Sequence, residues 1–450
     1  MTFSLVIGRI HLTSFSYSQS FDFVNNGATA SKYLALIQLL ETRLEKGLLI
    51  IEFRFHKLEM ICPICQSSHL RFLEYKYKKI IHSVSTHQKS IIRLHMRRYQ
   101  CKVCKKTFSE PNPLSDINEN ISLYTKTSIL NYLKDYNHTF TSAAIHYYVS
   151  IQTVINIFDR YVDAKRRKLA KVINIDEVFI SRTHAYKYAC VLFDFEGRKI
   201  IDILPRRHKH YLIKYFSRIP KSELDQVEVV VMDMWTSYKE VVHLCMPKAK
   251  VAVDSFHIIR TLNEIIKRLR IDTMNQYKQN KSAPIHDDVY YYMLKKFHYF
   301  FVKNYEDIYD GKIHIQKMHA YWHKSDILHY LLSINDDLKE AYMLKEWYRE
   351  FDLTAAYDTC DDELNKLVHQ FRNHKLAGLR SFGKTLINWR DEIKNSFLVY
   401  DNRRISNGPI ESVNNKIKTV IKTSNGIQSF NRLRNKIMYS INKDVPIKNK

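Results

Sequence analysis

The sequence lacks a long apolar run. It also has few glycines, and its number of cysteines is odd. No apolar segment approaches the roughly 18–20 residues that a helix needs to cross a bilayer, so we expect no membrane partner. The N-terminal stretch "MTFSLVIGRIHLTSF" has no basic segment followed by a long apolar region, which argues against a secretory signal. Four of the seven cysteines fall in two close pairs, a pattern that favours a reducing compartment and a metal over disulfides. We therefore expect a cytoplasmic protein.

Acidic residues are the scarcer charge, because 46 Asp and Glu stand against 71 Lys and Arg, a formal net charge of +25. This excess favours a polyanionic partner, and we expect nucleic acid. A generically basic soluble protein is the alternative on charge alone. Hydrophobic residues make up 45% and charged residues 26%, which is a globular composition. The 450 residues suffice for two or three domains. The abundance of Ile, Lys, Asn and Tyr over Gly is typical of an AT-rich bacterial genome, so we expect a bacterial, nucleoid-associated protein.

Residues 1–58 form an N-terminal segment whose role the sequence does not define. One stretch of it, "SKYLALIQLLETRLEKG" over residues 31–47, has a helical pattern. Its apolar residues recur at helical spacing, and Gly47 reads as a stop signal. We predict a helix there, with an apolar face made of Leu34, Ile37, Leu40 and Leu44.

Two cysteine pairs, Cys62–Cys65 and Cys101–Cys104, mark residues 59–115 as a zinc-binding module. A gap of two residues lets both thiolates of one turn reach the same tetrahedral Zn²⁺ at about 2.3 Å. The segment between the pairs is longer than in most zinc ribbons, but its strand-like alternation can return the chain to close the site. Four unrelated free cysteines are the alternative. Two such pairs, each beside lysines and arginines, favour one structural zinc ion.

Residues 116–171 are predicted to form a helix-turn-helix DNA-binding domain. A helix over residues 122–136 precedes a second over 141–148, a turn at Val149–Ser150 and a third helix for which Ser150 is a good N-cap. This order is typical of a helix-turn-helix, although any three-helix bundle gives the same pattern. The expected inward residues are Leu123, Ile129, Leu130 and Leu133 in the first helix, and Ile151, Val154, Ile155 and Phe158 in the third.

A basic run, "KRRKLAK", follows these helices directly. A solvated linker would have the same composition. Beside a helix-turn-helix, however, the run also suits contacts to DNA phosphates. The candidate DNA-binding residues are Lys165, Arg166, Arg167 and Lys168.

From Val172 the periodicity changes to that of strands. The runs "VINIDEVFI", "YKYACVLFDF" and "RKIIDILP" predict a three-stranded meander. The strands "VEVVVMDMW" and "AKVAVDSFH" then alternate with helical segments, which indicates a mixed α/β sheet covered on both faces. Residues 272–400 lose the strand character and are predicted to be an all-helical insertion. The last clear element is "SNGPIESVNNKIKTVIK", residues 406–422.

Two of the strands end in an acid surrounded by apolar residues, Asp176 and Asp233. If both strands are central, the two side chains meet at one end of the sheet, where two unpaired carboxylates would repel each other. Divalent metal ions resolve that conflict, and two Mg²⁺ ions held by carboxylates are a common device for in-line phosphoryl transfer. The neighbouring Glu177 points to the opposite sheet face by the period of two.

A third carboxylate is expected on the helix over residues 406–422. Ser406 or Asn407 can cap this helix, and Pro409 suits its first turn. An ordinary amphipathic surface helix would have the same pattern. The apolar face consists of Ile410, Val413, Ile417 and Val420, and the polar side of Glu411, Asn414, Asn415, Lys418 and Lys422. Glu411 therefore lies in the first turn, while Lys418 and Lys422 can face a phosphate backbone.

Together these motifs resemble the DDE transposases with a ribonuclease-H-like core, and are closest to the ISL-three family of bacterial insertion-sequence transposases. The resemblance covers roughly residues 60–440. It is carried by the order and spacing of "CPIC", "RRYQCKVCKKTFSE", "NIDEVFI", "VVVMDMWTSYKEVV", "AKVAVDSFHIIR", "SNGPIESVNNKIK" and "FNRLRNKIMYSIN".

The resemblance implies a catalytic triad of Asp176, Asp233 and Glu411 that holds two Mg²⁺ or Mn²⁺ ions. Asp254 and His257, in "DSFH", match an Asp-x-x-His element of related transposase groups and are secondary candidates. The implied catalytic domain comprises residues 172–271 and 401–445. The implied function is binding of terminal inverted repeats, followed by metal-dependent cleavage and strand transfer to target DNA. Synapsis of two ends implies a homodimer.

Two other functions share most of these features. One is a zinc-finger DNA-binding regulator with an inactive nuclease-like core, which needs no triad. The other is a metal-dependent DNA nuclease without strand transfer, which uses the same two-metal chemistry. Cleavage that depends on Mg²⁺ or Mn²⁺ and is lost in Asp233→Ala would exclude the first, and strand-transfer products would exclude the second. Within the sheet, Glu177, Asp194 and Asp202 are alternative metal ligands.

Overall fold

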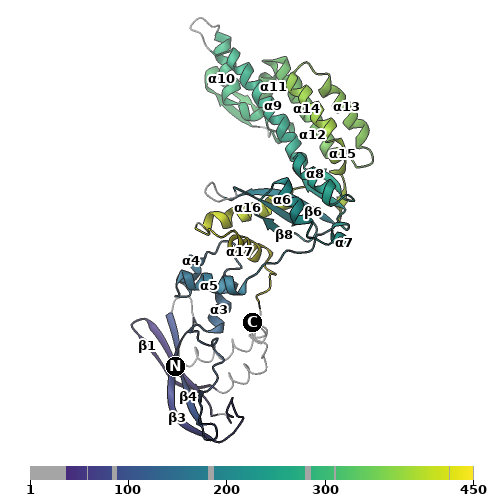
Figure 1. The fold of residues 1–450 in the computed structure, drawn as a ribbon. Helices are drawn as coiled ribbons and strands as arrows, with labels where there is room; N and C mark the ends of the chain where they lie inside the picture. The colour runs from purple at the N-terminus through teal and green to yellow at the C-terminus, as the bar shows by residue number, and fades with distance from the viewer. Residues whose placement is uncertain are drawn as a thin grey trace. The chain divides into compact units, whose positions relative to one another are not determined.

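The computed structural model describes residues 37–57, 59–83, 89–180, 187–278, 285–308, 311–424 and 426–448 (Figure 1). These residues divide into two compact units. The first consists of the chain up to Arg166 together with Asn415 onward, and the second of Arg167–Asn414. Across these ranges, every helix is too short or too polar to cross a bilayer.

The first unit contains a five-stranded sheet in the order β1-β2-β4-β3, with β5 paired to β4. The β2 and β4 strands are parallel and the other pairs antiparallel. The side chains of β2, β3 and β4 bury a small core of Phe53, Phe55, Ile80, Ile92 and Leu94. The strands are β1 (Ile37–Glu45), β2 (Leu48–Phe55), β3 (Leu70–Ile81), β4 (Lys89–Cys101) and β5 (Thr107–Ser109).

The helix predicted over residues 31–47 is wrong for its described part, because Ile37–Glu45 forms strand β1. Lys46 and Gly47 have φ angles of 46° and 78°, and Glu45 pairs directly with Leu48 across them. A two-residue turn with both φ angles positive joins hairpin strands. Gly47 is therefore a hairpin-turn residue and not a helix stop, and strand pairing overrides the local helical spacing. The part of the predicted helix before residue 37 lies outside the described residues.

The boundary expected near residue 58 does not separate two structures. Strand β2 lies on the N-terminal side of it and pairs in parallel with β4, which ends at Cys101. The described part of the N-terminal segment therefore shares a sheet with the cysteine pairs. The expected return of the chain between the pairs is confirmed, because β3 and β4 run antiparallel and Leu70 pairs with Cys101.

Three helices follow the sheet: α3 (Leu123–Tyr132), α4 (Phe140–His146) and α5 (Ile151–Tyr161). Ser150 is the N-cap of α5, and its hydroxyl accepts a hydrogen bond of 3.1 Å from the Thr153 backbone N–H. Val154 and Phe158 are buried as expected, whereas Ile151 is 45% exposed and Ile157 is buried instead.

The C-terminal helix α17 (Phe430–Asn442) was expected in the catalytic domain, but it belongs to the first unit. The Lys436 ammonium donates a 2.7 Å hydrogen bond to the carbonyl of Leu133, just after α3. The rings of Tyr439 and Phe158 lie 5.8 Å apart, edge to face. Burial lowers the pKa of Lys436 to about 8. Hydrogen bonding at the end of α3 and packing on α5 place this helix with the three-helix group.

The second unit is built on a five-stranded sheet in the order β10-β9-β6-β7-β8. The β6, β7 and β8 strands form the predicted antiparallel meander, and β6, β9 and β10 are parallel. The strands are β6 (Val172–Phe179), β7 (Tyr188–Asp194), β8 (Lys199–Leu204), β9 (Val229–Met232) and β10 (Lys250–Val253). Both sheet faces are buried, as the continuous apolar runs predict.

Helices cover one face of this sheet (Figure 1). Side chains such as Ile175 and Met232 share a core there with residues of α6, α8 and α9. On the opposite face, Val172, Val229 and Val231 pack with Ile405, just before α16. The helices of this unit are α6 (Lys209–Phe216), α7 (Lys221–Leu224), α8 (Thr236–Cys245) and α9 (Ser255–Gln276), and α16 (Gly408–Thr423) begins in it, whereas its residues from Asn415 onward belong to the first unit.

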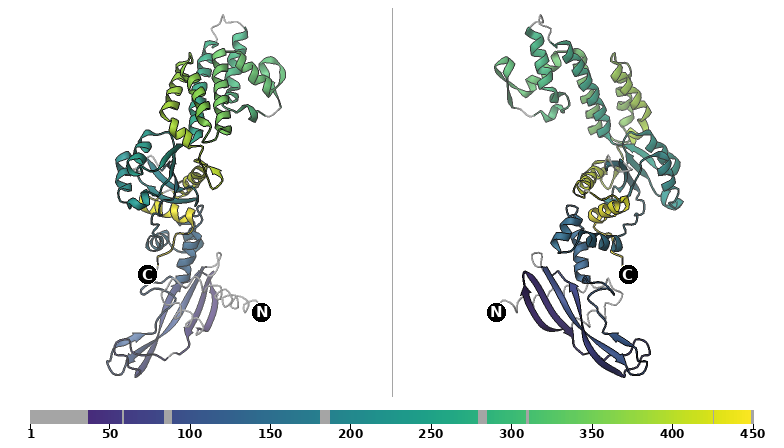
Figure 2. Two further views of the ribbon diagram at one scale, coloured as in Figure 1. Left: turned by 90° about the vertical axis from the view of Figure 1, so that its right-hand side faces the viewer. Right: turned by 60° about the vertical axis from the view of Figure 1, so that its left-hand side comes forward.

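The predicted insertion is mainly helical, and its helices lie side by side in a bundle with α9 (Figure 2). It is not all-helical, however, because β11 (Lys312–Ile315) and β12 (Ala320–His323) form a hairpin. A second short pair, β13 (Val399–Tyr400) and β14 (Arg403–Arg404), follows the bundle. The helices are α10 (Ile285–Lys296), α11 (Lys324–Ser333), α12 (Asp336–Thr354), α13 (Cys360–Arg372), α14 (Ala377–Asn388) and α15 (Arg390–Asn395).

Candidate functional site

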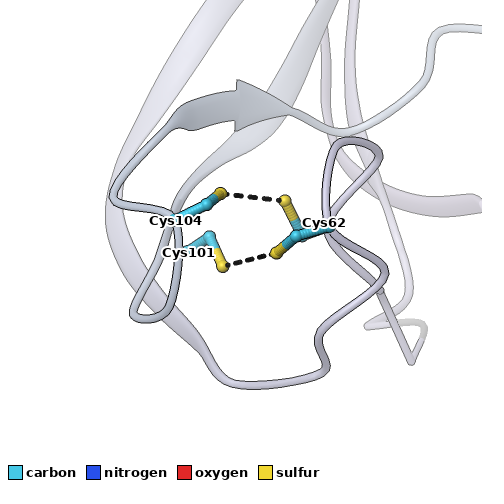
Figure 3. A group of neighbouring side chains, drawn as sticks. Cys62, Cys101 and Cys104 are labelled. Carbon is cyan, nitrogen blue, oxygen red and sulfur yellow. Dashed lines mark hydrogen bonds between the residues drawn. The ribbon is translucent and has the colours of Figure 1, made fainter.

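The four predicted zinc ligands come together in the first unit. The sulfur atoms of Cys62, Cys65, Cys101 and Cys104 all lie within 4.8 Å of one another. Figure 3 shows Cys62 facing Cys101 and Cys104. The sulfur–sulfur distance is 3.6 Å for Cys62–Cys104 and 3.5 Å for Cys65–Cys101. A tetrahedral zinc ion with bonds of about 2.3 Å separates its sulfur ligands by roughly 3.8 Å. The four-cysteine group therefore fits a zinc ion.

The two cysteine turns have the same local geometry. Gln66 and Lys105 each follow the second cysteine of a pair, and both have a φ of 60°. In each turn the backbone N–H of the first cysteine donates to a carbonyl five residues later, at 2.9 Å. Backbone N–H groups from the Cys104 end of the turn lower the pKa of Cys101 to about 6. Backbone N–H groups also lower the pKa of Cys62, so the first cysteine of each turn favours the thiolate form that binds zinc, whereas burial and the neighbouring thiols raise the pKa of Cys104 to about 11.

Three aspartates lie at the carboxyl edge of the parallel strands in the second unit. Met232 of β9 pairs with Ile175 of β6 and with Val253 of β10. The next residues along the three strands are Asp176, Asp233 and Asp254, so the three acids occupy the same register position. Asp176 lies on β6, and Asp233 directly follows the adjacent strand β9. Because this register sets three carboxylates in a row at one sheet edge, it concentrates negative charge there.

Histidine and asparagine residues form hydrogen bonds with these acids. The His257 Nε2 lies 3.0 Å from Oδ1 of Asp233, and the Asn407 amide donates to the same oxygen at 3.1 Å. The Asn414 amide donates to Oδ2 of Asp176 at 2.6 Å. The backbone N–H of Asn407 lies 3.5 Å from Oδ1 of Asp254. His257, a secondary candidate in the sequence, therefore contacts a primary candidate directly.

Glu411 lies in the first turn of α16, as predicted, and its side chain is exposed. Its backbone N–H donates to the carbonyl of Asn407 at 2.9 Å, which places it one helical turn from the residue that contacts Asp233. The carboxylate oxygens of the three proposed triad acids do not all lie within 4.8 Å of one another. Among the residues that the structure describes, the four cysteines are the only group of three or more potential ligands with ligand atoms within 4.8 Å.

Comparisons with known proteins match the second unit and the segment after Asn414 that extends into α17. Residues 173–437 match the model of a family described as transposase, the ISL-three group of DDE transposases. The chain belongs to this family. The transposase for insertion sequence element IS1001 of Bordetella parapertussis is 22% identical to this chain over 253 residues. The match covers 56% of this chain and 56% of that protein, so the chain spans little more than half of the relative's length.

The acids at this edge of the sheet have shifted pKa values. Burial, together with the charge of Asp233, raises the pKa of Asp176 to about 7. Burial also raises the pKa of Asp254 to about 6, with further contributions from the charges of Glu411 and Asp233. The hydrogen bond to Asp233 raises the pKa of His257. Acids that face one another without a cation have raised pKa values, because two neighbouring negative charges repel each other.

The other acids considered as ligands have partners elsewhere. Glu177 forms an ion pair with Arg207, whose guanidinium lies 4.9 Å from the centre of the Trp235 ring. Asp194 accepts a 2.8 Å hydrogen bond from the backbone of Gly197 in the β7–β8 turn. Asp202 accepts one of 2.7 Å from the hydroxyl of Tyr215 on α6. These contacts give each of the three acids another partner, although the charge of Glu177 also contributes to the raised pKa of the adjacent Asp176.

The candidate DNA-binding residues are mostly exposed. Lys165, Arg167 and Lys168 are exposed in a segment without helix or strand, and Arg166 is half-buried. Lys418 and Lys422 are exposed on α16. The apolar face predicted for that helix is confirmed, because Ile410, Val413, Ile417 and Val420 are all buried.

Asn174, Asn407 and Asn414 are site residues that the sequence analysis did not assign to the site. Asn174 interrupts an apolar strand two residues before Asp176 and is fully buried. Asn414 was expected on the polar side of α16, but it is only 4% exposed and faces Asp176. A polar residue inside the apolar run "VINID" was the available signal, because such a residue needs a buried partner.

The raised pKa of Asp176 predicts that metal-free stability falls as pH rises. Between about pH 4 and pH 7 the folded chain holds a proton on Asp176 that the unfolded chain has lost, so ionisation of Asp176 destabilises the fold. Asp176→Asn should therefore stabilise the second unit at pH 8, by at most about 4 kcal/mol, and have little effect at pH 4. Urea unfolding followed by tryptophan fluorescence measures this, since all four tryptophans lie in the second unit.

Asp225→Asn is the control for this experiment. It removes a carboxylate of the same unit that pairs with Lys248 at 2.9 Å, and it should leave the pH dependence in place. An Asp176→Asn chain with the same pH dependence as the wild-type chain would show that Asp176 is not the titrating group.

Proposed function

We propose that this transposase binds the terminal inverted repeats of an insertion sequence and catalyses metal-dependent DNA cleavage and strand transfer. Asp176, Asp233 and Glu411 are the proposed catalytic acids. The observation that carries the proposal is the shared register of Asp176, Asp233 and Asp254 at the carboxyl edge of three parallel strands. Ligands in open α/β sheets bind at this edge of the strands.

The strand order supports a ribonuclease-H-like core. An antiparallel meander, β6 to β8, is extended on its β6 side by the parallel strands β9 and β10. The first acid lies on the first strand of the meander and the second follows the adjacent parallel strand. The helical insertion separates these strands from α16, which carries Glu411. This arrangement supports the catalytic core that the family resemblance implies for residues 172–271, completed by the start of α16, whereas α17 belongs to the first unit.

The donor set fits a hard divalent cation. Carboxylate oxygens are the ligands that Mg²⁺ and Mn²⁺ prefer, and the row of aspartates lacks a lysine or arginine partner among the described ion pairs. Asp176, Asp233 and Glu411 would hold two such ions, and Asp254 is a secondary candidate ligand. When bound, the ions would activate the attacking hydroxyl and stabilise the leaving oxygen.

The chain's own residues prepare this site. The His257 Nε2 lies 3.0 Å from Oδ1 of Asp233, and this hydrogen bond raises the pKa of His257. His257 is thus proposed to orient Asp233 and not to take part in the chemistry. Glu411 is exposed at the start of α16, where a carboxylate also interacts favourably with the helix dipole. From that position it can complete the site when DNA is bound.

The first unit is proposed to bind the DNA ends. Helices α4 and α5 with the turn between them support the predicted helix-turn-helix, and α5 would enter the major groove. The exposed basic residues Lys165, Arg167 and Lys168 would contact phosphates. We further propose one structural zinc ion in the four-cysteine group and a homodimer in the synaptic complex.

The proposed function is tested by incubating the full chain with Mn²⁺ and duplex DNA that carries an element end. Cleavage at the end and joined products with a target duplex are the expected results. Cleavage without joining would identify a nuclease, and binding without cleavage would identify a regulator.

The exposed face of α5 should determine the preference for element ends. Gln152 and Asn156 are exposed there, and their side chains hydrogen-bond each other at 2.7 Å. Amide side chains read adenine in the major groove. The double variant Gln152→Ala, Asn156→Ala should lower the ratio of end binding to random-duplex binding about 5- to 150-fold. Fluorescence anisotropy with both duplexes measures the ratio.

The matched control for this prediction is the double variant Lys165→Ala, Lys168→Ala. It should weaken binding to both duplexes equally, and each lost phosphate contact should reduce the salt slope by roughly 0.9. An unchanged ratio in the Gln152/Asn156 variant would remove α5 from the recognition surface.

A further inference from the structure

Two buried asparagines connect α16 to the two aspartates of the candidate metal site. Asn407 is 1% exposed and Asn414 is 4% exposed. Burial of an amide costs free energy unless its groups find hydrogen-bond partners. Each of these amides donates to one aspartate, Asn407 to Asp233 and Asn414 to Asp176. The two contacts therefore give each buried amide nitrogen a partner, whereas Oδ1 of Asn414 is buried without one.

A third amide fixes the orientation of Asn407. The Asn174 amide nitrogen donates to the backbone carbonyl of Ser406 at 2.9 Å and to Oδ1 of Asn407 at 2.8 Å. Because a carbonyl can only accept, Asn174 must present its nitrogen on this side. Asn407 then presents its oxygen to Asn174 and its nitrogen to Asp233. This network has one consistent orientation, so the position of Asp233 Oδ1 is defined by the strand β6 and the start of α16.

Asn414 acts on the other aspartate. Its amide donates to Oδ2 of Asp176, while Oδ1 of Asp176 accepts a 2.7 Å hydrogen bond from the backbone N–H of Glu177. Both oxygens of Asp176 are thus oriented. The spacing of Asn407, Glu411 and Asn414, four and then three residues, places the three side chains on one face of the helix. One helical face therefore carries the proposed third acid and both amides.

We propose that Asn407 and Asn414 are positioning residues that set Asp233 and Asp176 in the orientation a divalent cation needs. This inference rests on the proposed function. An amide donor orients a carboxylate without neutralising it, whereas a lysine or arginine at the same place would compete with the cation for it. Groups that orient metal ligands in this way typically contribute 10- to 100-fold to metal affinity.

The test is a Mn²⁺ titration of the full zinc-loaded chain, followed by the electron paramagnetic resonance signal of free Mn²⁺. Asn407→Leu and Asn414→Leu keep the branching and approximate volume of the side chain but remove the donor. Each variant should bind Mn²⁺ about 10- to 100-fold more weakly than the wild-type chain. Asn415→Leu is the matched control, because Asn415 is the exposed neighbour of Asn414, and its Mn²⁺ affinity should not change.

A second readout separates positioning from a merely structural role. Mn²⁺ should raise the urea midpoint of the wild-type second unit, and this rise should shrink in the Leu variants while the metal-free midpoint stays near that of the wild type. If a Leu variant does not fold, as judged by tryptophan fluorescence, the corresponding Ala variant replaces it in the same titration.

The outcomes distinguish this inference from the proposed function. If the double variant Asp176→Ala, Asp233→Ala binds Mn²⁺ as the wild-type chain does, the metal site itself is misplaced and the proposed function fails. If that double variant loses Mn²⁺ binding but the folded Asn407 and Asn414 variants bind as tightly as the wild type, the positioning role is overturned and the proposed function stands.

Discussion

Replacement of Asp176 or Asp233 by Asn, or of Glu411 by Gln, is expected to reduce DNA-end cleavage by at least about 10³-fold. Charge stabilisation by metal ions at the transition state is worth several kcal/mol, and each 1.36 kcal/mol is a factor of ten in rate. These variants should bind the DNA end as the wild-type chain does, because binding is assigned to the first unit and cleavage to the second. A gel assay of Mn²⁺-dependent nicking, with anisotropy for binding, measures both quantities on one preparation.

Asp194→Asn is the matched control for this series. Asp194 lies on the same sheet, but its carboxylate accepts a turn hydrogen bond from Gly197, a role that an Asn oxygen can also fill. The control should cleave at the wild-type rate. If Asp194→Asn lost cleavage while Glu411→Gln retained it, the assignment of the third acid would be wrong.

The second large effect is expected at the four-cysteine group. The double variant Cys101→Ser, Cys104→Ser should lose the zinc ion, so that metal analysis falls from about one zinc per chain to none. Structural zinc contributes on the order of 10–16 kcal/mol to the folding of small zinc modules. The zinc end of the β3–β4 hairpin should therefore unfold, and DNA-end binding should be lost. Hydrogen exchange over residues 59–109 measures the local unfolding.

Cys245→Ser is the control for the zinc variant. Cys245 lies on α8 in the second unit and is not a member of the four-cysteine group, so its replacement should change neither the zinc content nor the exchange pattern. The tryptophan fluorescence of the second unit should also be unchanged in the zinc variant. A full zinc complement in the Cys101/Cys104 variant would exclude the proposed ligand set.

The strands of the second unit were predictable because they are buried on both faces. A strand covered on both sides is apolar throughout, so the runs that end at Asp176 and Asp233 stand out from the helical segments around them. The four-cysteine group was predictable for a similar reason, since a two-residue gap within each pair is the spacing that a tetrahedral metal site requires and does not depend on distant contacts.

Features that depend on pairing between distant segments were not predictable. The apolar spacing of residues 31–47 fits a helix, yet the hairpin turn at Lys46–Gly47 pairs its described part with β2. The pattern of α17 shows an amphipathic helix but not its partner, and its buried Lys436 bonds to the end of α3. In both places a local pattern leaves the tertiary partner open, and the partner decides the structure.

The candidate site also contains some residues that were predictable from the sequence and others that were not. Apolar flanks reveal Asp176 and Asp233, but the strand register alone shows that Asp254 occupies the equivalent position on the third strand. Helical periodicity places Asn414 on the polar side of α16, where the sequence does not distinguish solvent from a buried carboxylate. The 2.6 Å contact between Asn414 and Asp176 could be identified only from the folded structure.

The central claim is that Asp176, Asp233 and Glu411 share a divalent-metal site when DNA is bound. The most direct measurement is the anomalous scattering of Mn²⁺ in crystals of the full chain with a DNA end. We expect manganese peaks within roughly 2.0–2.3 Å of carboxylate oxygens from all three residues. Glu411 lying well over about 10 Å from both aspartates in the assembled complex, beyond any shared ligand shell, would contradict the claim and direct attention to Glu177, Asp194 or Asp254.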